Sequence, residues 1–171
     1  DWMVRECLSR NDGAIHYIRA YRKNVTEVYE PGTKFELGKG KVLIPGDEVL
    51  LVGSGYLMGD ALTAAEELRA QGISVEVVDP VTIKPFDEEL ILNETKGKKL
   101  VVTYENHGTV NGIGSAVADV LAKNGAGVPL LKLGATEIFG QVGMVDLLKE
   151  AYKLTAKDAV AEILKAWHKV N

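Results

Sequence analysis

The sequence predicts an α/β fold, namely an open, doubly wound, mostly parallel sheet of about five strands with helices on both faces. Two observations lead to this prediction. After residue 46, short apolar runs rich in valine, isoleucine and leucine alternate with longer segments of helical periodicity, a pattern typical of parallel βαβ units. The chain has 171 residues, of which 46% are hydrophobic and 26% charged, so it can form one globular domain of ordinary size and a fragment of a second.

The elements of this domain follow one another in a regular order. The expected strands are residues 48–52, 73–78, 99–104 and 128–133. The expected helices are residues 56–71, 86–93, 112–124, 144–151 and 156–170. Gly72 should end the first of these helices, because glycine readily adopts the left-handed conformation that follows a helix. Thr155 and Asp158 resemble a capping box at the start of the last helix, with Asp in place of the usual Glu or Gln.

The first 46 residues lack this alternation of strands and helices. Residues 2–10 have the apolar spacing of the end of a helix. Residues 14–18 are rich in β-branched and aromatic side chains, which favours a strand, and we expect its partner strands to lie in another part of the protein. A polar stretch with several glycines and prolines follows, and within it we expect a small hairpin between residues 34–37 and 41–44.

These differences divide the chain into two parts. We assign residues 1–34 to the end of a preceding domain and a linker, and residues 35–171 to the α/β domain. Because the first residue is Asp1, we expect the chain to begin inside a longer natural polypeptide or after a removed tag. No apolar run approaches the ~20 residues that span a bilayer, and no signal peptide opens the sequence, so we expect no membrane partner.

Charge and cysteine content exclude several classes of function. The net charge of −4 argues against a nucleic-acid partner, because binding to phosphate backbones depends on clustered lysine and arginine. The single cysteine, Cys7, cannot form an internal disulfide, which indicates a reducing, cytoplasmic compartment. The three histidines and Cys7 are too scattered in the sequence for the ligand spacing of a metal site.

A glycine-rich turn after the first domain strand resembles a dinucleotide-binding motif. Residues 53–59 contain three glycines, and Asp79 ends the next strand, roughly where such a motif places an acidic residue. The third glycine comes one position late and only two strands follow Asp79, so a tight strand-to-helix turn is the favoured interpretation. Ser54 and Gly55 leave open anion binding at a helix N-terminus. A ligand-binding or regulatory module therefore stays an alternative, while a small nucleotide-dependent oxidoreductase is disfavoured.

Two further groups of residues are candidates for a functional site. Glu105 and His107 follow the third domain strand, at the edge where parallel sheets bind ligands. The alternative is that Glu105 orders the loop and His107 is a surface or domain-contact residue. Arg19 and Arg22 follow the apolar residues 14–18, and a guanidinium group suits a phosphate. From spacing alone, a solvated strand end is favoured.

Three stretches taken together resemble the transketolase family. They are residues 12–22, 73–87 and 105–117. The first is similar to the final strand of the family's pyrimidine-binding domain, with Ala14 in place of the common proline. The resemblance then continues through the family's C-terminal domain and covers essentially the whole chain. It is closest to transketolases that are split into two subunits, and deoxyxylulose-phosphate synthases and the β subunits of 2-oxo acid dehydrogenase E1 share the same domain.

The resemblance implies transfer of a two-carbon ketol unit between sugar phosphates, through thiamine diphosphate with Mg²⁺ or Ca²⁺. The family's G-D-G motif, distant Asn and activating Glu are not in this chain, so we expect it to bind no cofactor or metal alone and to be inactive alone. The implied partners are the remaining transketolase domains or an N-terminal subunit, and a second copy in a homodimer.

The resemblance carries over to few residues. Arg22 falls where the family has an arginine that binds the sugar phosphate, whereas Arg19 is expected to be structural. Glu105 and His107 are candidates for a contact with neighbouring domains or for the substrate channel. Asn106 lies between them, where relatives often have a second Glu.

Overall fold

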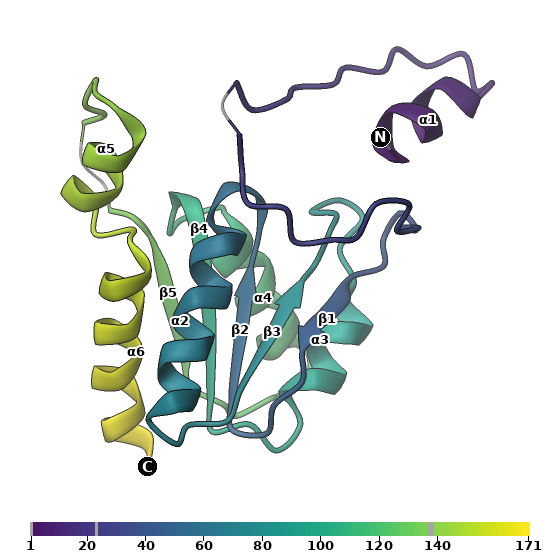
Figure 1. Cartoon of the computed structure of the whole chain (residues 1–171). Helices are drawn as coiled ribbons and strands as arrows, with labels where there is room; N and C mark the ends of the chain where they lie inside the picture. Colours follow the sequence, from purple (N-terminus) through teal and green to yellow (C-terminus); the bar gives the residue numbers. More distant parts are fainter. Residues whose placement is uncertain (1, 23, 137–138) are drawn as a thin grey trace.

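A five-stranded sheet between two layers of helices forms the body of the molecule (Figure 1). The computed structural model describes residues 2–22, 24–136 and 139–171. The strand order is β1-β3-β2-β4-β5, in which β1 is antiparallel to β3 and the other neighbours are parallel. This arrangement confirms the predicted fold class.

The bounds of most elements lie within a few residues of the expected ranges. The strands are β1 (Lys41–Ile44), β2 (Val49–Gly53), β3 (Val75–Asp79), β4 (Leu100–Gly108) and β5 (Leu130–Ala135). The helices are α1 (Trp2–Ser9), α2 (Met58–Ala70), α3 (Glu88–Thr95), α4 (Ile113–Lys123), α5 (Val145–Ala151) and α6 (Ala156–Val170), and a short 3-10 turn, η1 (Gly55–Leu57), precedes α2.

The central strand β2 is buried on both faces. Val49 and Leu51 pack in the cluster that α2 and α6 cover. Leu50 and Val52 pack on the opposite face, in the cluster beneath α3 and α4. Because successive side chains of a strand point to opposite faces, a strand covered on both sides must be apolar throughout. This explains why the sequence shows a continuous apolar run here.

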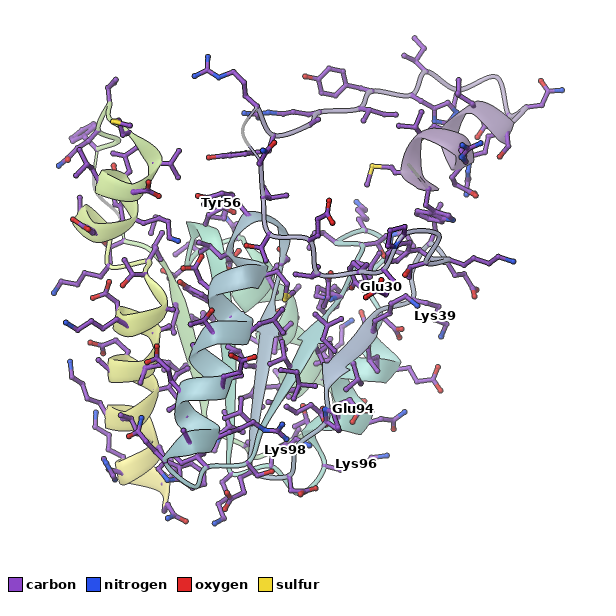
Figure 2. The ribbon with its side chains drawn as sticks, viewed as in Figure 1. Glu30, Lys39, Tyr56, Glu94, Lys96 and Lys98 are labelled. Atoms are coloured by element: carbon purple, nitrogen blue, oxygen red, sulfur yellow. The ribbon has the colours of Figure 1, made fainter. Side chains whose placement is uncertain are left out.

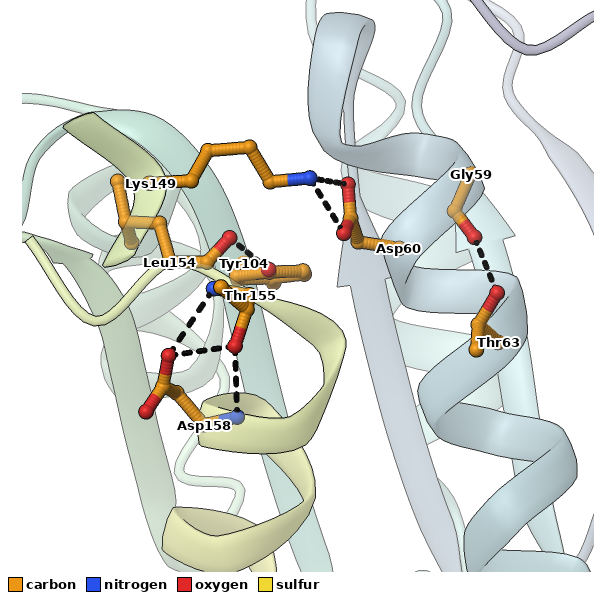
Figure 3. Close-up of polar contacts among 8 residues, drawn as sticks. All are labelled: Gly59, Asp60, Thr63, Tyr104, Lys149, Leu154, Thr155 and Asp158. Carbon is orange, nitrogen blue, oxygen red and sulfur yellow. Dashed lines mark hydrogen bonds and ion pairs between the residues drawn. The ribbon is translucent and has the colours of Figure 1, made fainter. Parts of the chain in front are cut away.

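The predicted local sequence signals lie at the end of α2 and at the start of α6. Gly72 follows α2 with φ of 87°, a conformation that costs glycine little. At the start of α6, the Thr155 side chain accepts a hydrogen bond from the Asp158 amide, and the Asp158 side chain accepts one from the Thr155 amide (Figure 3). The predicted capping box is therefore confirmed.

The N-terminal part differs from the prediction in two places. The expected hairpin between residues 34–37 and 41–44 is wrong, because residues 41–44 form β1 and pair with β3 at the edge of the sheet. Residues 14–18 are not a strand in the described structure. The side chains of Ile15 and Tyr17 there are 99% and 85% exposed. That their partner strands lie in another part of the protein stays a prediction.

Candidate functional site

A cleft lies at the edge of the sheet where the parallel strands end. β2, β3, β4 and β5 run in the same direction, so their carboxyl ends meet at one edge, which is where open α/β sheets bind ligands. Residues 2–22 and 24–34, which we call the N-terminal tail, pass along this edge (Figure 1). The cleft between tail and edge has a volume of about 840 Å³, and we call it the tail cleft. Its lining includes Arg19, Tyr21, Arg22, Tyr56, Asp79 and Asn106.

Two arginines give the tail cleft cationic character. Arg19 and Arg22 both line it and are exposed. Neither guanidinium group has an ion-pair partner within the described part of the chain. Gly55, the first residue of η1, lines the same cleft. The arrangement favours binding of an anion, since a guanidinium group can donate two parallel hydrogen bonds to a phosphate or carboxylate.

Two tyrosines join the tail to η1 of the domain beside these arginines. The rings of Tyr21 and Tyr56 are stacked, with centroids 4.7 Å apart and planes at 26°. Tyr56 lies at the top of α2, beneath the tail (Figure 2). The ammonium group of Lys149 is 5.6 Å from the centroid of the Tyr56 ring. The same ammonium group donates hydrogen bonds of 2.6 and 2.7 Å to the two carboxylate oxygens of Asp60 (Figure 3).

Asp79 holds the next part of the tail. The Tyr29 hydroxyl donates a 2.7 Å hydrogen bond to Oδ2 of Asp79, and the Val81 amide donates a 2.8 Å hydrogen bond to Oδ1. Burial raises the pKa of Tyr29, and the hydrogen bond to Asp79 raises it further, so the phenol stays protonated and acts as the donor. Each oxygen of Asp79 thus accepts a hydrogen bond from the chain itself, which favours a structural role for Asp79 over the ribose-binding role of a dinucleotide site.

The structure places Glu105 away from the tail cleft. Glu105 is 3% exposed. Its two carboxylate oxygens accept hydrogen bonds of 2.7 and 2.8 Å from the amides of Ile113 and Gly114. These are among the amides at the start of α4 that have no partner within the helix, so Glu105 fixes the loop that leads into α4. A role in a domain contact or substrate channel stays a prediction.

The neighbouring residues Asn106 and His107 point to different surroundings. Asn106 lines the tail cleft together with Arg22. His107 is exposed, and its Nδ1 atom lies 3.0 Å from the carbonyl oxygen of Gly108. His107 is not in the lining of the tail cleft, and its proposed part in a domain contact stays a prediction.

Sequence reasoning missed the roles of Tyr21, Tyr56 and Asp79 in building the cleft. The available signal was position in the sequence, because Tyr21 directly precedes Arg22 and Tyr56 directly follows Gly55 within the glycine-rich turn. Among the described residues, there is no group of three or more His, Cys, Asp or Glu that could hold a metal ion. No helix in that part of the chain is long and apolar enough to cross a membrane.

Comparisons with known proteins match the domain and the tail. The family model described as "Transketolase, C-terminal domain" matches residues 38–159. The chain is 42% identical over 161 residues to a 6-deoxy-6-sulfo-D-fructose transketolase subunit from Clostridium sp. (strain MSTE9), covering 94% of this chain and 48% of that protein. It is 39% identical over 155 residues to a putative transketolase C-terminal section from Methanocaldococcus jannaschii, covering 90% of this chain and 48% of that protein.

A solved structure gives the same result. The structure titled "Split gene transketolase, inactive beta4 tetramer" superposes with a TM-score of 0.82 at 40% identity, and the match covers 88% of this chain and 49% of that one. The chain therefore spans about half the length of these relatives. The predicted resemblance is confirmed, and the chain belongs to the transketolase family, whose C-terminal domain it contains.

Proposed function

We propose that this chain is the C-terminal part of a transketolase-like enzyme that transfers a two-carbon ketol unit between sugar phosphates. The match of the family model to residues 38–159 carries this proposal. Residues 35–171 act as the C-terminal domain, and residues 1–34 are the end of the preceding, pyrimidine-binding domain and a linker. Relatives that are named a transketolase subunit and a transketolase C-terminal section support the division of the enzyme.

The cofactor of such an enzyme is thiamine diphosphate, bound with Mg²⁺ or Ca²⁺. The described residues do not fit this group, since they contain no cluster of acidic or metal-ligating side chains, and the sequence has no G-D-G motif. We therefore assign cofactor binding to the other domains. This chain contributes substrate contacts and assembly, and it is inactive alone.

Arg22 is the residue of this chain that we assign to the substrate. It lines the tail cleft at the carboxyl edge and has no ion-pair partner among the described residues, so its charge is available to a sugar phosphate. Arginine stays protonated at all physiological pH values and presents several N–H donors in a fixed plane, which suits a dianion. Glu105 and His107 are proposed only as candidates for a contact with the neighbouring domains or for the substrate channel.

The proposed partners are the remaining transketolase domains or an N-terminal subunit, together with a second copy of this polypeptide in a homodimer. A solved relative, described as a β4 tetramer and as inactive, is consistent with a C-terminal subunit that requires another component for activity. The exposed hydrophobic side chains of Ile15 and Tyr17 in the tail fit a segment that the preceding domain covers.

Reconstitution tests the proposed activity. We expect turnover of xylulose 5-phosphate with ribose 5-phosphate only when this chain is joined to domains that carry the activating Glu and the G-D-G motif. A coupled spectrophotometric assay of the isolated chain and of the reconstituted enzyme measures this. Turnover by the isolated chain would contradict the proposal, as would an inactive complex that binds thiamine diphosphate.

A substitution in the complete enzyme tests Arg22. Arg22→Ala should raise KM for phosphorylated sugars much more than KM for unphosphorylated ones, because only the former lose a charged contact. Arg19→Ala is the matched control, since Arg19 lines the same cleft and is expected to be structural. Equal effects of Arg22→Ala on both kinds of sugar would show that Arg22 does not bind the phosphate.

A further inference from the structure

We propose that Tyr56 is a positioning residue for Arg22: its ring stacks on Tyr21 and thereby holds the arginine-bearing tail over the carboxyl edge of the sheet. This inference rests on the phosphate-binding role proposed for Arg22. Tyr56 of the C-terminal domain would thereby support the substrate site, although Arg22, which it positions, belongs to the tail.

Within this chain, the backbone near Arg22 has little regular structure, although we expect residues 14–18 to pair with strands of the preceding domain. Residues 10–22 form no helix or strand, and all of them are exposed. No backbone hydrogen bond to the sheet is found for residues 14–22. Within this chain, the position of Arg22 relative to the domain therefore depends on contacts made by the side chains next to it in sequence.

The stack with Tyr56 is such a contact, next to Arg22 in sequence. The ring centroids of Tyr21 and Tyr56 are 4.7 Å apart, within the range in which stacked aromatic pairs attract each other. Both rings line the tail cleft together with Arg22. Because Tyr21 and Arg22 are consecutive residues, fixing the Tyr21 ring limits the positions that the guanidinium group can reach.

The domain in turn holds the Tyr56 ring in place. Lys149 on α5 lies against one side of it, with 5.6 Å between the ammonium group and the ring centroid. Asp60 on α2 binds the same ammonium group through both carboxylate oxygens (Figure 3). The Lys149 and Asp60 side chains are only 19% and 18% exposed, so water screens this pair less than an ion pair at the open surface. The ammonium group of Lys149, held beside the Tyr56 ring, also attracts the ring electrostatically and so helps to fix the ring in place.

Later contacts fix the chain that follows. A Cβ atom at Gly59 would lie 2.6 Å from the Thr26 hydroxyl oxygen, so the glycine allows the tail to pass close to α2. Tyr29 is then tied to Asp79 by its 2.7 Å hydrogen bond. Val28 also packs against the core of the domain. Among these contacts of the described residues, the one at Tyr56 is nearest to Arg22 along the chain.

Kinetics of the complete enzyme test this inference. Tyr56→Ala should raise KM for phosphorylated sugars about three- to tenfold, with less than a twofold change in kcat or in KM for unphosphorylated sugars, because the loss of one aromatic pair has about this effect. Tyr56→Phe should keep the wild-type values, since the Tyr56 hydroxyl makes no hydrogen bond to any described residue and the ring remains. If Tyr56→Ala alters both kinds of sugar equally, or if Tyr56→Phe is as impaired as Tyr56→Ala, the positioning role is contradicted.

A double substitution separates this inference from the role of Arg22 itself. If Tyr56 acts through Arg22, Tyr56→Ala should have no further effect on KM when Arg22→Ala is already present. A full additional increase would overturn the inference. If Arg22→Ala shows phosphate selectivity but Tyr56→Ala does not, only the positioning role fails. If Arg22→Ala shows no selectivity, the phosphate role fails and the positioning role fails with it.

Amide hydrogen exchange gives a readout that does not depend on activity. In the complete enzyme, where we expect strands of the preceding domain to protect the amides of the tail, Tyr56→Ala should increase exchange in residues 17–22, and Tyr56→Phe should leave it unchanged. Exchange in α2 serves as the internal reference for folding of the domain. Unchanged exchange of residues 17–22 in Tyr56→Ala would overturn the inference.

Discussion

The α/β domain and the N-terminal tail are stabilised in different ways. Every residue of β2 is buried, and the core on both faces of the sheet comes from the domain. Helix α1 in the tail has no buried residue. The tail contacts the domain through individual side chains, such as the Tyr21–Tyr56 stack and the hydrogen bond from Tyr29 to Asp79. The domain is therefore stable through its own core, whereas the placement of the tail, including Arg22, rests on a few separate contacts.

The largest expected effect is a loss of core packing in the domain. Leu51→Ala removes a fully buried side chain from the central strand and should lower the free energy of unfolding by about 4 kcal/mol, the cost of lost burial plus a cavity. Urea denaturation followed by circular dichroism measures it. Ile15→Ala in the tail is the matched control, since Ile15 is 99% exposed, and should change stability by less than about 0.5 kcal/mol. Similar losses in both variants would refute the contrast between domain and tail.

The next effect concerns a cation that is paired and buried, unlike the arginines of the tail. Lys98 lies at the edge of the sheet opposite Tyr56 (Figure 2). Its ammonium group is 3.4 Å from Glu76 and donates a 2.8 Å hydrogen bond to the Gly46 carbonyl. Lys98→Met leaves the Glu76 carboxylate buried without its cation, which should cost about 3 kcal/mol at neutral pH.

This cost should depend on pH. Burial raises the pKa of Glu76, and the charge of Lys98 opposes that rise. Without Lys98, the pKa of Glu76 in the folded state should lie further above its unfolded value of 4.5. A group with a raised folded pKa favours folding below the unfolded pKa, and this contribution is lost as pH rises through the folded pKa. Urea titrations should therefore show a small defect near about pH 4 and the full defect at neutral pH. A defect independent of pH would contradict this explanation.

A smaller loss is expected at the start of α4. Glu105→Ala leaves the amides of Ile113 and Gly114 without the carboxylate that accepts their hydrogen bonds, and should cost about 2 kcal/mol. Glu105→Gln keeps an acceptor oxygen and should cost about half as much. Thermal unfolding of both variants measures this. If neither variant loses stability while the complete enzyme loses activity, Glu105 serves the substrate channel or a domain contact and not the loop.

The sequence predicted the domain well because its elements are encoded locally. The apolar run at residues 49–52 identifies a strand buried on both faces, and Thr155 with Asp158 marks the start of α6. The contacts of the N-terminal part are not local. β1 pairs with β3, and Tyr29 binds Asp79, which lies 50 residues away along the chain. Periodicity carries no information about such pairings, so the hairpin prediction was wrong.

The candidate site was predictable only in part for the same reason. Arg22 came from the family resemblance, and the carboxyl edge came from the expected parallel sheet. Tyr56 and Asp79 lie under the tail because the tail crosses that edge of the sheet. No local sequence pattern specifies this path, so their contacts with the tail could not be predicted. Glu105 shows the converse, because a residue at the end of a strand can serve the next helix and not a ligand.

The smallest expected effect tests whether residues 24–36 unfold together with the domain or independently of it. Tyr29→Phe removes the donor to Oδ2 of Asp79, while Oδ1 keeps its hydrogen bond from the Val81 amide. The free energy of unfolding should fall by about 1 kcal/mol, the net value of one hydrogen bond, and amide exchange should increase in residues 24–36. Tyr17→Phe is the control, since Tyr17 is 85% exposed. Faster exchange without a loss of stability would mean that residues 24–36 open independently of the domain. Each contact of the tail would then act separately from the others.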